Sequence, residues 1–375
     1  MNVLQISKFY WPVIGGIEAV TWELAEGLVR RGLQVDVLCS NQQWRTTRER
    51  FASGYDVVRA GSLGMLLSTS MSPAMLAQLF ALTRGRDVLH VHMPDPMAAL
   101  AILAVRPRGR VVVHWHSDVI RQRRSMALYE PLQSWLLQRA DAIVATSQPY
   151  LEASQPLQRW RSKVTVIPIG ISDRSTLAGP DKVAAIRRRF EGRRIVFSLG
   201  RITYYKGLEV LLDAAARLPE DTVVLIGGEG ELLEHLRSQV VAGGLERQVH
   251  FLGHVPNEDL PSYYQACDVF CMSSTVRAEA YGVAIVEAMM MGRPIVATDI
   301  PGSGVPWVNV PGLTGFNAPV GDADALALAL LRLLGDASLR ARLGAASRQR
   351  YLSEFDSEKM TSDTIDLYRR LLNSA

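Results

Sequence analysis

The sequence predicts an α/β protein built from two Rossmann-like doubly wound domains that face each other across a cleft. Short β-branched and apolar runs alternate with amphipathic runs, which is typical of βαβ units and a mostly parallel sheet. The alternation stops at a polar stretch with Gly and Pro, 173–181, and then restarts. The 375 residues, 48% of them hydrophobic, suffice for two cores of ordinary domain size.

The first half opens with the strand 2–7, followed by a helix 16–32. Apolar residues recur in this helix every three or four positions, and Gly32 is its stop signal. The pattern then predicts, in chain order, strand 34–40, strand 87–93, helix 96–105, strand 110–116, helix 125–139, strand 142–147 and strand 163–172.

The second half repeats the alternation. Its predicted elements are strand 194–201, helix 206–218, strand 222–228, helix 229–243, strand 249–255, helix 257–266, strand 268–274, helix 282–291, strand 294–299 and helix 322–335. A last helix, roughly 358–373, follows a break, and the pattern alone assigns it to neither domain. We therefore expect domains at 1–170 and 171–355, with a C-terminal helix at 356–375.

Several bulk features exclude classes of protein. The sequence has no run of 18 uncharged apolar residues, which is the length needed to span a membrane. Its start lacks the basic region and the long apolar region of a signal peptide. Three cysteines, Cys39, Cys267 and Cys271, are too few for a disulfide scaffold and favour a reducing compartment. Cys267 and Cys271 lack a second ligand pair, so buried small hydrophobes are expected there. These features predict a cytoplasmic protein.

Charge is distributed unevenly along the chain. Residues 1–170 hold 19 Lys and Arg against 12 Asp and Glu, a net charge of +7, whereas the remainder has a net charge of −3. Arginines cluster in the first half, at Arg45, Arg48, Arg50, Arg106, Arg108, Arg110, Arg121, Arg123 and Arg124. No stripe interleaves them with aromatic residues, so nucleic acid is not expected as a partner. An anionic membrane surface or a lipid phosphate fits better, and a solvated basic face is the alternative.

Two loops that follow predicted strands are suited to anions. Gly15 and Gly16 stand between a strand and a helix, where glycines let the backbone approach a ligand closely. They do not form the G-x-G-x-x-G dinucleotide fingerprint. Arg201 and Lys206 lie between a strand and a helix, where Arg would bind an anion bidentately and Lys as a point charge. A plain turn and unliganded surface charges are the alternatives.

Two pairs of histidines have a spacing that is also found among metal ligands. His90 with His92, and His114 with His116, form H-x-H pairs whose members share one face of a strand. No further ligands that complete a metal site are evident in the sequence. We interpret His116 as a side chain in the ligand cleft that donates to a phosphate or sugar hydroxyl, with a satisfied core histidine as the alternative.

A D-x-D motif binds a metal–diphosphate in some sugar transferases. Here Asp322 and Asp324 directly precede a helix rich in Leu and Ala. An N-cap with an acid in the first helical turn explains both residues, so no metal site is predicted.

The stretch RAEAYGVAIVEAMMMG, residues 277–292, carries Glu279 and Glu287. On one helix they would be about 12 Å apart, farther than the roughly 5–5.5 Å of a retaining glycosidase pair. A helix starting near Gly282 would instead place Glu279 in the preceding loop and Glu287 in the second turn. Free amides at about Gly282, Val283 and Ala284 would attract phosphate, and both carboxylates would suit sugar hydroxyls. A first-turn acid and an ordinary helix glutamate are the alternative.

These motifs in this order resemble the family 4 retaining nucleotide-sugar glycosyltransferases over nearly the whole chain. The elements are the Gly-Gly loop, the His after a strand, "GR…KG", and E-x(7)-E ahead of "GRPIVAT". The resemblance implies the GT-B fold, with the acceptor on 1–170, the nucleotide sugar on 171–355, and the helix 356–375 crossing back to the N-terminal domain. It implies a nucleotide diphosphate sugar as co-substrate and no metal or other cofactor.

The resemblance also implies a role for each candidate residue. Arg201 and Lys206 would neutralise the leaving diphosphate, Glu287 would bind the ribose, and Glu279 would bind the transferred sugar. The loop at Gly15–Gly16 would close over the phosphates, and His116 would line the sugar site. The implied catalytic set is Glu279, His116, Arg201 and Lys206. The implied donor-binding set is Gly15, Gly16, Arg201, Lys206, Gly282, Val283, Ala284 and Glu287. Whether Glu279 is catalytic or only positions the sugar stays open.

A narrower similarity runs through "HWHSDVIRQ…LLQRADAIVATSQPYLEAS", residues 114–154, to bacterial mannosyl- and rhamnosyltransferases of O-antigen or exopolysaccharide assembly. It implies hexose transfer from GDP-mannose or a related GDP-sugar to a polyprenyl-diphosphate-linked glycan, on the inner face of the cytoplasmic membrane. Alternatives are a nucleotide-sugar epimerase or sugar phosphorylase on the same fold, and a non-catalytic nucleotide-sugar or lipid-binding protein. The base, sugar, acceptor, linkage and oligomeric state are not fixed by the sequence.

Overall fold

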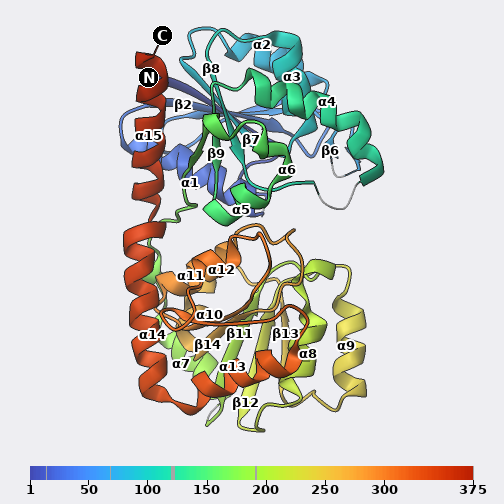
Figure 1. The fold of residues 1–375 in the computed structure, drawn as a ribbon, viewed down its shortest axis with the longest axis vertical. Helices are drawn as coiled ribbons and strands as arrows, with labels where there is room; N and C mark the ends of the chain where they lie inside the picture. Colours follow the sequence, from blue (N-terminus) through green and yellow to red (C-terminus); the bar gives the residue numbers. More distant parts are fainter. Residues whose placement is uncertain (14, 68, 120–122, 191, 375) are drawn as a thin grey trace. The chain divides into compact units, whose positions relative to one another are not determined.

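The computed structural model describes residues 1–375 except 14, 68, 120–122, 191 and 375. The chain folds into two compact units (Figure 1). Unit 1 comprises Met1–Ser172 together with Ser357–Ala375, and unit 2 comprises Asp173–Asp356. Each unit is an α/β structure with a mainly parallel sheet, so the predicted fold class is confirmed.

In its described residues, unit 1 contains an eight-stranded sheet in the order β10–β9–β8–β7–β1–β2–β4–β3, parallel except for the pair β3–β4. Its strands are β1 (Asn2–Ser7), β2 (Gln34–Ser40), β3 (Thr47–Arg50), β4 (Asp56–Ala60), β7 (Val88–Met93), β8 (Arg110–Trp115), β9 (Ala142–Ala145) and β10 (Val164–Val166), and a separate hairpin pairs β5 (Met65–Leu66) with β6 (Thr69–Ser70). The central strands β1, β7 and β8 are almost wholly buried, which explains their continuous apolar runs.

Helices flank this sheet. They are α1 (Gly16–Arg30), α2 (Ala74–Leu82), α3 (Pro96–Val105), α4 (Arg123–Arg139), α5 (Gln148–Ala153), α6 (Gln155–Gln158), the 3₁₀ turn η1 (Arg161–Lys163) and α15 (Ser357–Asn373). Asp95 begins α3 as its N-cap and accepts hydrogen bonds from the amides of Met97 and Ala98 at 3.1 and 3.3 Å. The α1 helix starts directly after Gly15, where the sequence placed it.

Unit 2 contains a six-stranded parallel sheet in the order β13–β12–β11–β14–β15–β16. The strands are β11 (Arg194–Leu199), β12 (Thr222–Gly227), β13 (Val249–Gly253), β14 (Val269–Met272), β15 (Ile295–Thr298) and β16 (Gly315–Ala318). The surrounding helices are η2 (Ser175–Leu177), α7 (Pro180–Arg189), η3 (Tyr204–Lys206), α8 (Leu208–Ala215), α9 (Leu233–Ala242), α10 (Leu260–Ala266), α11 (Val283–Met290), α12 (Val305–Val308), α13 (Ala323–Gly335), α14 (Ala337–Arg350) and the π-helical turn η4 (Tyr351–Phe355).

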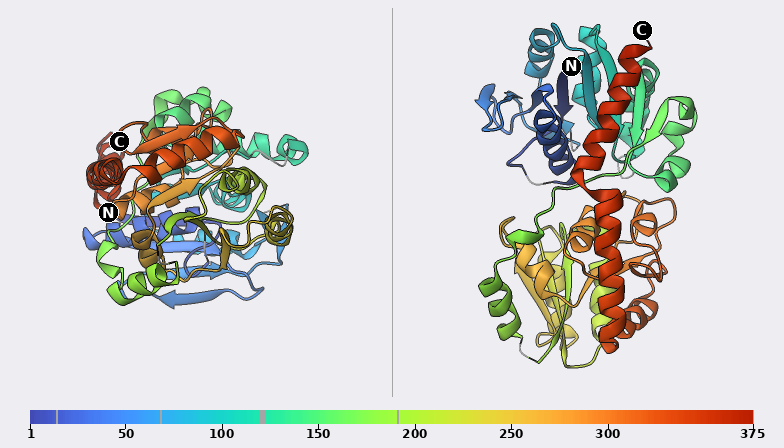
Figure 2. Two further views of the ribbon diagram at one scale, coloured as in Figure 1. Left: turned by 90° about the horizontal axis from the view of Figure 1, so that it is seen from below. Right: turned by 90° about the vertical axis from the view of Figure 1, so that its left-hand side faces the viewer.

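The α15 helix packs on α1 within unit 1 (Figure 2). Gly27 of α1 allows this close approach, because a Cβ at that position would collide with the hydroxyl of Thr361. Glu358 accepts hydrogen bonds from both Arg30 and Arg31 at the start of α15. The helix thus joins unit 1 by close packing and by charge pairing.

Two helices of unit 2 are among those that were not predicted from the sequence. The polar stretch interpreted as a linker contains η2 and the start of α7, with Pro180 at the first helical position. The α14 helix was missed because its few buried residues, such as Leu343, do not form a continuous apolar stripe. Among the described residues, no helix is both long and apolar enough to cross a membrane.

Candidate active site

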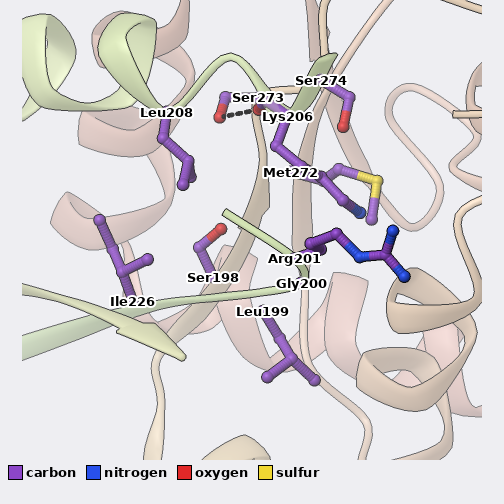
Figure 3. A pocket seen from close by; sticks show the side chains of 10 residues that line it. All are labelled: Ser198, Leu199, Gly200, Arg201, Lys206, Leu208, Ile226, Met272, Ser273 and Ser274. Carbon is purple, nitrogen blue, oxygen red and sulfur yellow. Dashed lines mark hydrogen bonds between the residues drawn. The ribbon is translucent and has the colours of Figure 1, made fainter. Parts of the chain in front are cut away.

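A pocket lies at the carboxyl ends of β11, β12 and β14 in unit 2 (Figure 3). Ligands of doubly wound sheets bind at this edge. The pocket is lined by Ser198, Leu199, Gly200, Arg201, Lys206, Leu208, Ile226, Met272, Ser273 and Ser274. Two of the candidate residues from the sequence, Arg201 and Lys206, are therefore brought to one pocket, and the two serines after β14 were not foreseen.

Backbone contacts between loops shape this pocket. Gly207 has a φ of +59°, and a Cβ there would collide with the carbonyl oxygen of Ser273. Its neighbour Lys206 accepts a hydrogen bond from the Ser273 hydroxyl through its carbonyl oxygen at 3.0 Å. In addition, the amide of Thr275 donates to the carbonyl oxygen of Tyr205 at 2.8 Å. The loop after β11 is thus fixed against the loop after β14.

Lys206 and Glu279 form an ion pair in this site. The Lys206 Nζ lies 2.6 Å from Glu279 Oε2, and the two side chains are only 13% and 11% exposed. Ser274 Oγ donates to the same carboxylate oxygen at 3.1 Å. Desolvation of Lys206 disfavours its charge, but the charge of Glu279 outweighs this, and the pKa of Lys206 is raised. Lys206 therefore stays a cation, and Glu279 is held at a defined point beside it.

Arg201 differs from Lys206 in having its guanidinium available. It is exposed, and its side chain makes no hydrogen bond or ion pair with any residue in the described part of the chain. Both cations extend to the same side of the pocket in Figure 3. A guanidinium without a protein partner next to a lysine is a suitable binding site for a dianionic group such as a diphosphate.

The start of α11 separates the two glutamates of the 277–292 stretch. Gly282 precedes the helix with a φ of +87°, and the helix runs from Val283, so Glu279 lies in the loop. The amide of Ile285 donates back to the Gly282 carbonyl at 2.9 Å. The amides ahead of it, on Val283 and Ala284, lie at the helix end where intrahelical acceptors are missing. This helix start has the local form that the sequence predicted.

Glu287 lies in the second turn of α11 and contacts Tyr264. The Tyr264 hydroxyl donates to Glu287 Oε2 at 2.6 Å and reaches the carbonyl oxygen of Ala284 at 3.2 Å. Burial, followed by the Glu287 charge, raises the pKa of Tyr264 well above its usual value, so the hydroxyl keeps its proton and remains a donor. Tyr264 orients Glu287 and was not identified from the sequence, since only the fold brings α10 against α11.

Three candidates, Gly15, Gly16 and His116, belong to unit 1. Gly15 is the N-cap residue of α1, and a Cβ added to it would meet only the flexible carboxylate of Glu18. Gly16 is exposed, and nothing lies within 4 Å of a Cβ added there. The space beside Gly16 is therefore open, whereas the carboxylate of Glu18 lies beside Gly15.

His116 follows β8 and belongs to a buried cluster of four histidines. The register pairs His92 of β7 with His114 of β8, so the two H-x-H motifs meet on adjacent strands. The His114 and His116 rings stack with centroids 4.2 Å apart, and the His90 and His114 rings share a hydrogen bond of 3.1 Å. Nothing in the sequence indicated that the two pairs lie together; in the structure, ligand nitrogens of His90, His92 and His114 lie within 4.8 Å of one another.

The D-x-D motif and the cysteines each have contacts or burial of a kind common in folded domains. Asp322 caps α13 by accepting a hydrogen bond from the Ala325 amide at 2.8 Å, as predicted. Asp324 pairs with Arg217 at the surface. Cys39, Cys267 and Cys271 are buried free thiols. Burial raises the pKa of Cys267 to about 12, which makes it an inert thiol at neutral pH.

Comparison with known proteins identifies the class. Residues 14–174 match the model described as Glycosyltransferase Family 4, and residues 181–350 match that of Glycosyl transferases group 1. The chain is 33% identical over 377 residues to O-antigen chain mannosyltransferase C of Escherichia coli, and the match covers 100% of both chains. The protein is therefore a glycosyltransferase with the GT-B fold and belongs to family 4.

Other similarities extend over the same length. A D-rhamnosyltransferase of Pseudomonas aeruginosa is 34% identical over 360 residues, covering 95% of this chain and 92% of the relative. Among solved structures, HepE of Anabaena in complex with UDP superposes with a TM-score of 0.78 at 22% identity, over 99% of this chain and 100% of HepE. A sucrose-phosphate synthase of Thermosynechococcus elongatus gives 0.82 at 22% identity, over 100% of both chains. These structures establish the fold alone.

Proposed function

We propose that this glycosyltransferase is a retaining hexosyltransferase that moves mannose or a related hexose from a GDP-sugar to a polyprenyl-diphosphate-linked glycan. Bacterial surface polysaccharide is the proposed product. The full-length similarity to an O-antigen mannosyltransferase and a D-rhamnosyltransferase supports the sugar and the acceptor class.

The observation that carries the proposal is the pairing of Lys206 with Glu279 beside an exposed Arg201. Cleavage of a sugar–phosphate bond leaves negative charge on the diphosphate and positive charge on the sugar ring. Lys206, Arg201 and the amides at the start of α11 stabilise the negative charge on the diphosphate, because they are fixed before the reaction begins. Glu279 accepts hydrogen bonds from the sugar hydroxyls, and its charge favours the oxocarbenium-like ring.

The proposed step is a front-face substitution. An acceptor hydroxyl oxygen forms a bond to the anomeric carbon on the side from which the diphosphate leaves. The bond from that carbon to the phosphate oxygen breaks with its electron pair, and the acceptor proton passes to the departing diphosphate. No protein carboxylate attacks, so no covalent glycosyl-enzyme is formed and the configuration is retained.

Charge neutralisation by protein cations leads us to propose that no metal ion is required. Asp322 is already used as a helix cap, so the D-x-D motif is not needed to hold a metal–diphosphate. Full activity in excess EDTA is the expected result. A loss of activity that Mg²⁺ or Mn²⁺ restores would overturn this part of the proposal.

The test of the activity is a donor panel with a polyprenyl-diphosphate-linked acceptor. Acceptor-dependent release of GDP and a product that keeps the anomeric configuration of the donor are expected. Conversion of the donor without acceptor would instead show an epimerase, and formation of sugar phosphate from inorganic phosphate would show a phosphorylase. Nucleotide-sugar binding with no turnover on any acceptor would show a binding protein.

We further propose that unit 1 docks on an anionic membrane, which would place the enzyme on the inner face of the cytoplasmic membrane. The β5–β6 hairpin exposes Met65 and Leu66 to solvent, at 53% and 58%, and Leu63, which precedes it by two residues, is 80% exposed. Trp44 is also exposed, and it lies near these residues because its loop contacts Gly61 and Ser62. The Arg45 guanidinium stacks on the Trp44 ring at 4.9 Å. Apolar side chains beside an aromatic ring and a cation suit the interface of an anionic bilayer.

The arginines of the cluster at 45–50 differ in whether an acidic residue neutralises them. Arg48 and Arg50 pair with Asp56, so they add little net charge, whereas Arg45 makes no ion pair with the described residues. Arg121, part of one predicted arginine cluster, lies outside the residues that the structure describes.

A further inference from the structure

We infer that Gln5 and His92 are positioning residues that hold His116 in one tautomer, with its Nδ1 ready to accept a hydrogen bond from a substrate hydroxyl. The inference rests on the proposed function, a sugar transfer for which the family resemblance implies His116 at the sugar site. It goes further by naming the working nitrogen and the two buried residues that select it.

The three residues form a continuous chain across neighbouring strands. Gln5 lies on β1, His92 on the adjacent β7, and His116 directly after β8. His92 Nε2 is 2.8 Å from the Gln5 amide oxygen, and His92 Nδ1 is 2.8 Å from His116 Nε2. All three side chains are buried, so water does not compete for these bonds.

The proton positions follow from the amide oxygen of Gln5, which the structure orients toward His92. An amide oxygen only accepts, so His92 Nε2 carries a proton and donates it. Burial lowers the pKa of both His92 and His116 well below the usual value, so each ring carries a single proton at neutral pH. His92 Nδ1 is then an acceptor, and the proton of His116 must lie on Nε2.

The remaining nitrogen, His116 Nδ1, therefore has a lone pair. It has no hydrogen-bond partner among the described residues, yet it is not one of the buried unpartnered atoms, as His114 Nε2 is. His116 thus meets a ligand as an acceptor. This reverses the expectation from the sequence, in which His116 was a donor.

A second branch of the cluster serves as an internal comparison. The Tyr368 hydroxyl lies 2.6 Å from His90 Nδ1, and His90 Nε2 lies 3.1 Å from His114 Nδ1. This branch ends at His114 Nε2, which is buried and unpartnered in the described structure. It has the same chemistry as the first branch but no atom that reaches a ligand.

A bound metal would be the other use of such a cluster, since ligand nitrogens of His90, His92 and His114 lie within 4.8 Å of one another. The ring planes argue against it. His92 and His114 stack at 5.2 Å with an angle of 24°, so their in-plane lone pairs lie in planes that are only slightly inclined to each other. Zinc requires nitrogens that converge on one point at about 2.0–2.1 Å.

Nitrogen-15 NMR of the full chain with labelled histidine tests the tautomer directly. The expected spectrum shows His116 with a protonated Nε2 and an unprotonated Nδ1, with the signals assigned by their loss in His116→Gln. Gln5→Leu should mix the two tautomers, and Gln5→Glu should keep the original one, since a carboxylate accepts from the same nitrogen. A protonated His116 Nδ1 in the wild type overturns the inference, as does a stoichiometric shift of the cluster signals on adding Zn²⁺.

Steady-state kinetics supply the second readout. Gln5→Leu should lower kcat by about tenfold, the equivalent of one hydrogen bond, while KM for the donor stays unchanged. Gln5→Glu should retain activity. Thr364→Val is the matched control, because it removes one buried hydrogen bond of unit 1, to the Met360 carbonyl, outside the histidine cluster. Equal losses in Gln5→Leu and Thr364→Val would reduce Gln5 to a structural role. If the wild type transfers no sugar the proposed function fails, yet the NMR spectrum still decides the relay, even where Gln5→Leu does not fold.

Discussion

At the scale of single residues, the site depends on the placement of charge. Lys206 and Glu279 come from loops 73 residues apart, and each fixes the other at 2.6 Å in a largely buried position. Removing one partner of such a pair leaves the other desolvated and unpaired, which is costly. The pair therefore holds the site in shape before any donor arrives, and Arg201 remains available for the diphosphate.

Substitution of Glu279 by Gln should lower kcat by about a hundredfold, because a neutral amide stabilises a cationic sugar ring far less than a carboxylate does. Steady-state release of nucleoside diphosphate measures the effect. Asp322→Asn is the matched control, since asparagine also caps a helix and the residue is remote in role from the pocket. An unaltered rate in Glu279→Gln would remove Glu279 from the site.

At the scale of elements, the sequence was most informative where a motif and a strand end coincide. The alternation predicted β11, α8 and α11 closely enough to place Arg201, Lys206 and Gly282 at or near their ends. It did not predict the roles of Ser274 and Tyr264, because their hydrogen bonds to Glu279 and Glu287 depend on how loops and helices pack in the fold. The histidine cluster was missed for the same reason, since the β7–β8 register is not visible in either H-x-H motif.

Gly282 illustrates how an element start constrains a site. A Cβ at this position would lie 3.0 Å from Ile285 Cδ1 and 3.3 Å from Val305 Cγ2, and the φ of +87° is unfavourable for alanine. Gly282→Ala should cost roughly 1–2 kcal/mol of stability and weaken donor binding, because the α11 amides shift. Urea unfolding and donor titration measure the two effects. Gly244→Ala, also at positive φ but in open space, should lose stability without losing donor affinity.

The β5–β6 hairpin leads to a prediction about membrane docking. Leu63→Ser and Leu66→Ser together should weaken binding to vesicles of phosphatidylglycerol and phosphatidylcholine by at least about tenfold, given the apolar area removed. Cosedimentation measures the bound fraction. Leu328→Ser in α13 is the control, because Leu328 is 67% exposed but lies in unit 2. Equal binding of the hairpin variant and the wild type would contradict docking through this hairpin.

At the scale of the whole molecule, the two units differ in charge and in buried titratable groups. The basic excess lies in residues 1–170, and the four buried histidines lie there as well. Burial lowers the pKa of all four histidines, that of His114 to about 3. The free energy of unfolding of unit 1 should therefore depend on pH, a property that does not follow from its fold class.

Acid should destabilise unit 1. The unfolded histidines titrate near pH 6.5, so below that pH the unfolded state binds protons that the folded state refuses, and stability falls by up to about 1.4 kcal/mol per pH unit for each histidine. The contribution of the four histidines to the free energy of unfolding is complete above pH 6.5. The pKa of Asp95, raised to about 6 by burial, gives a smaller opposite slope between about pH 4 and 6.

Urea titrations at several pH values between 5 and 7.5 check this prediction. His90→Gln should reduce the slope by one histidine's share and serves as the comparison. A free energy of unfolding that is constant from pH 7.5 to 5 would show that the histidines take up protons in the folded state.

The position of α15 has a consequence for the order in which the molecule is made. Unit 2 is one continuous stretch, whereas unit 1 needs Ser357–Ala375, which the ribosome adds only after all of unit 2. Until then Gly27 of α1 lacks its contact with Thr361, and His90 lacks the hydroxyl of Tyr368. Domains usually fold in the order of synthesis, but here the first unit to emerge is the last to be completed.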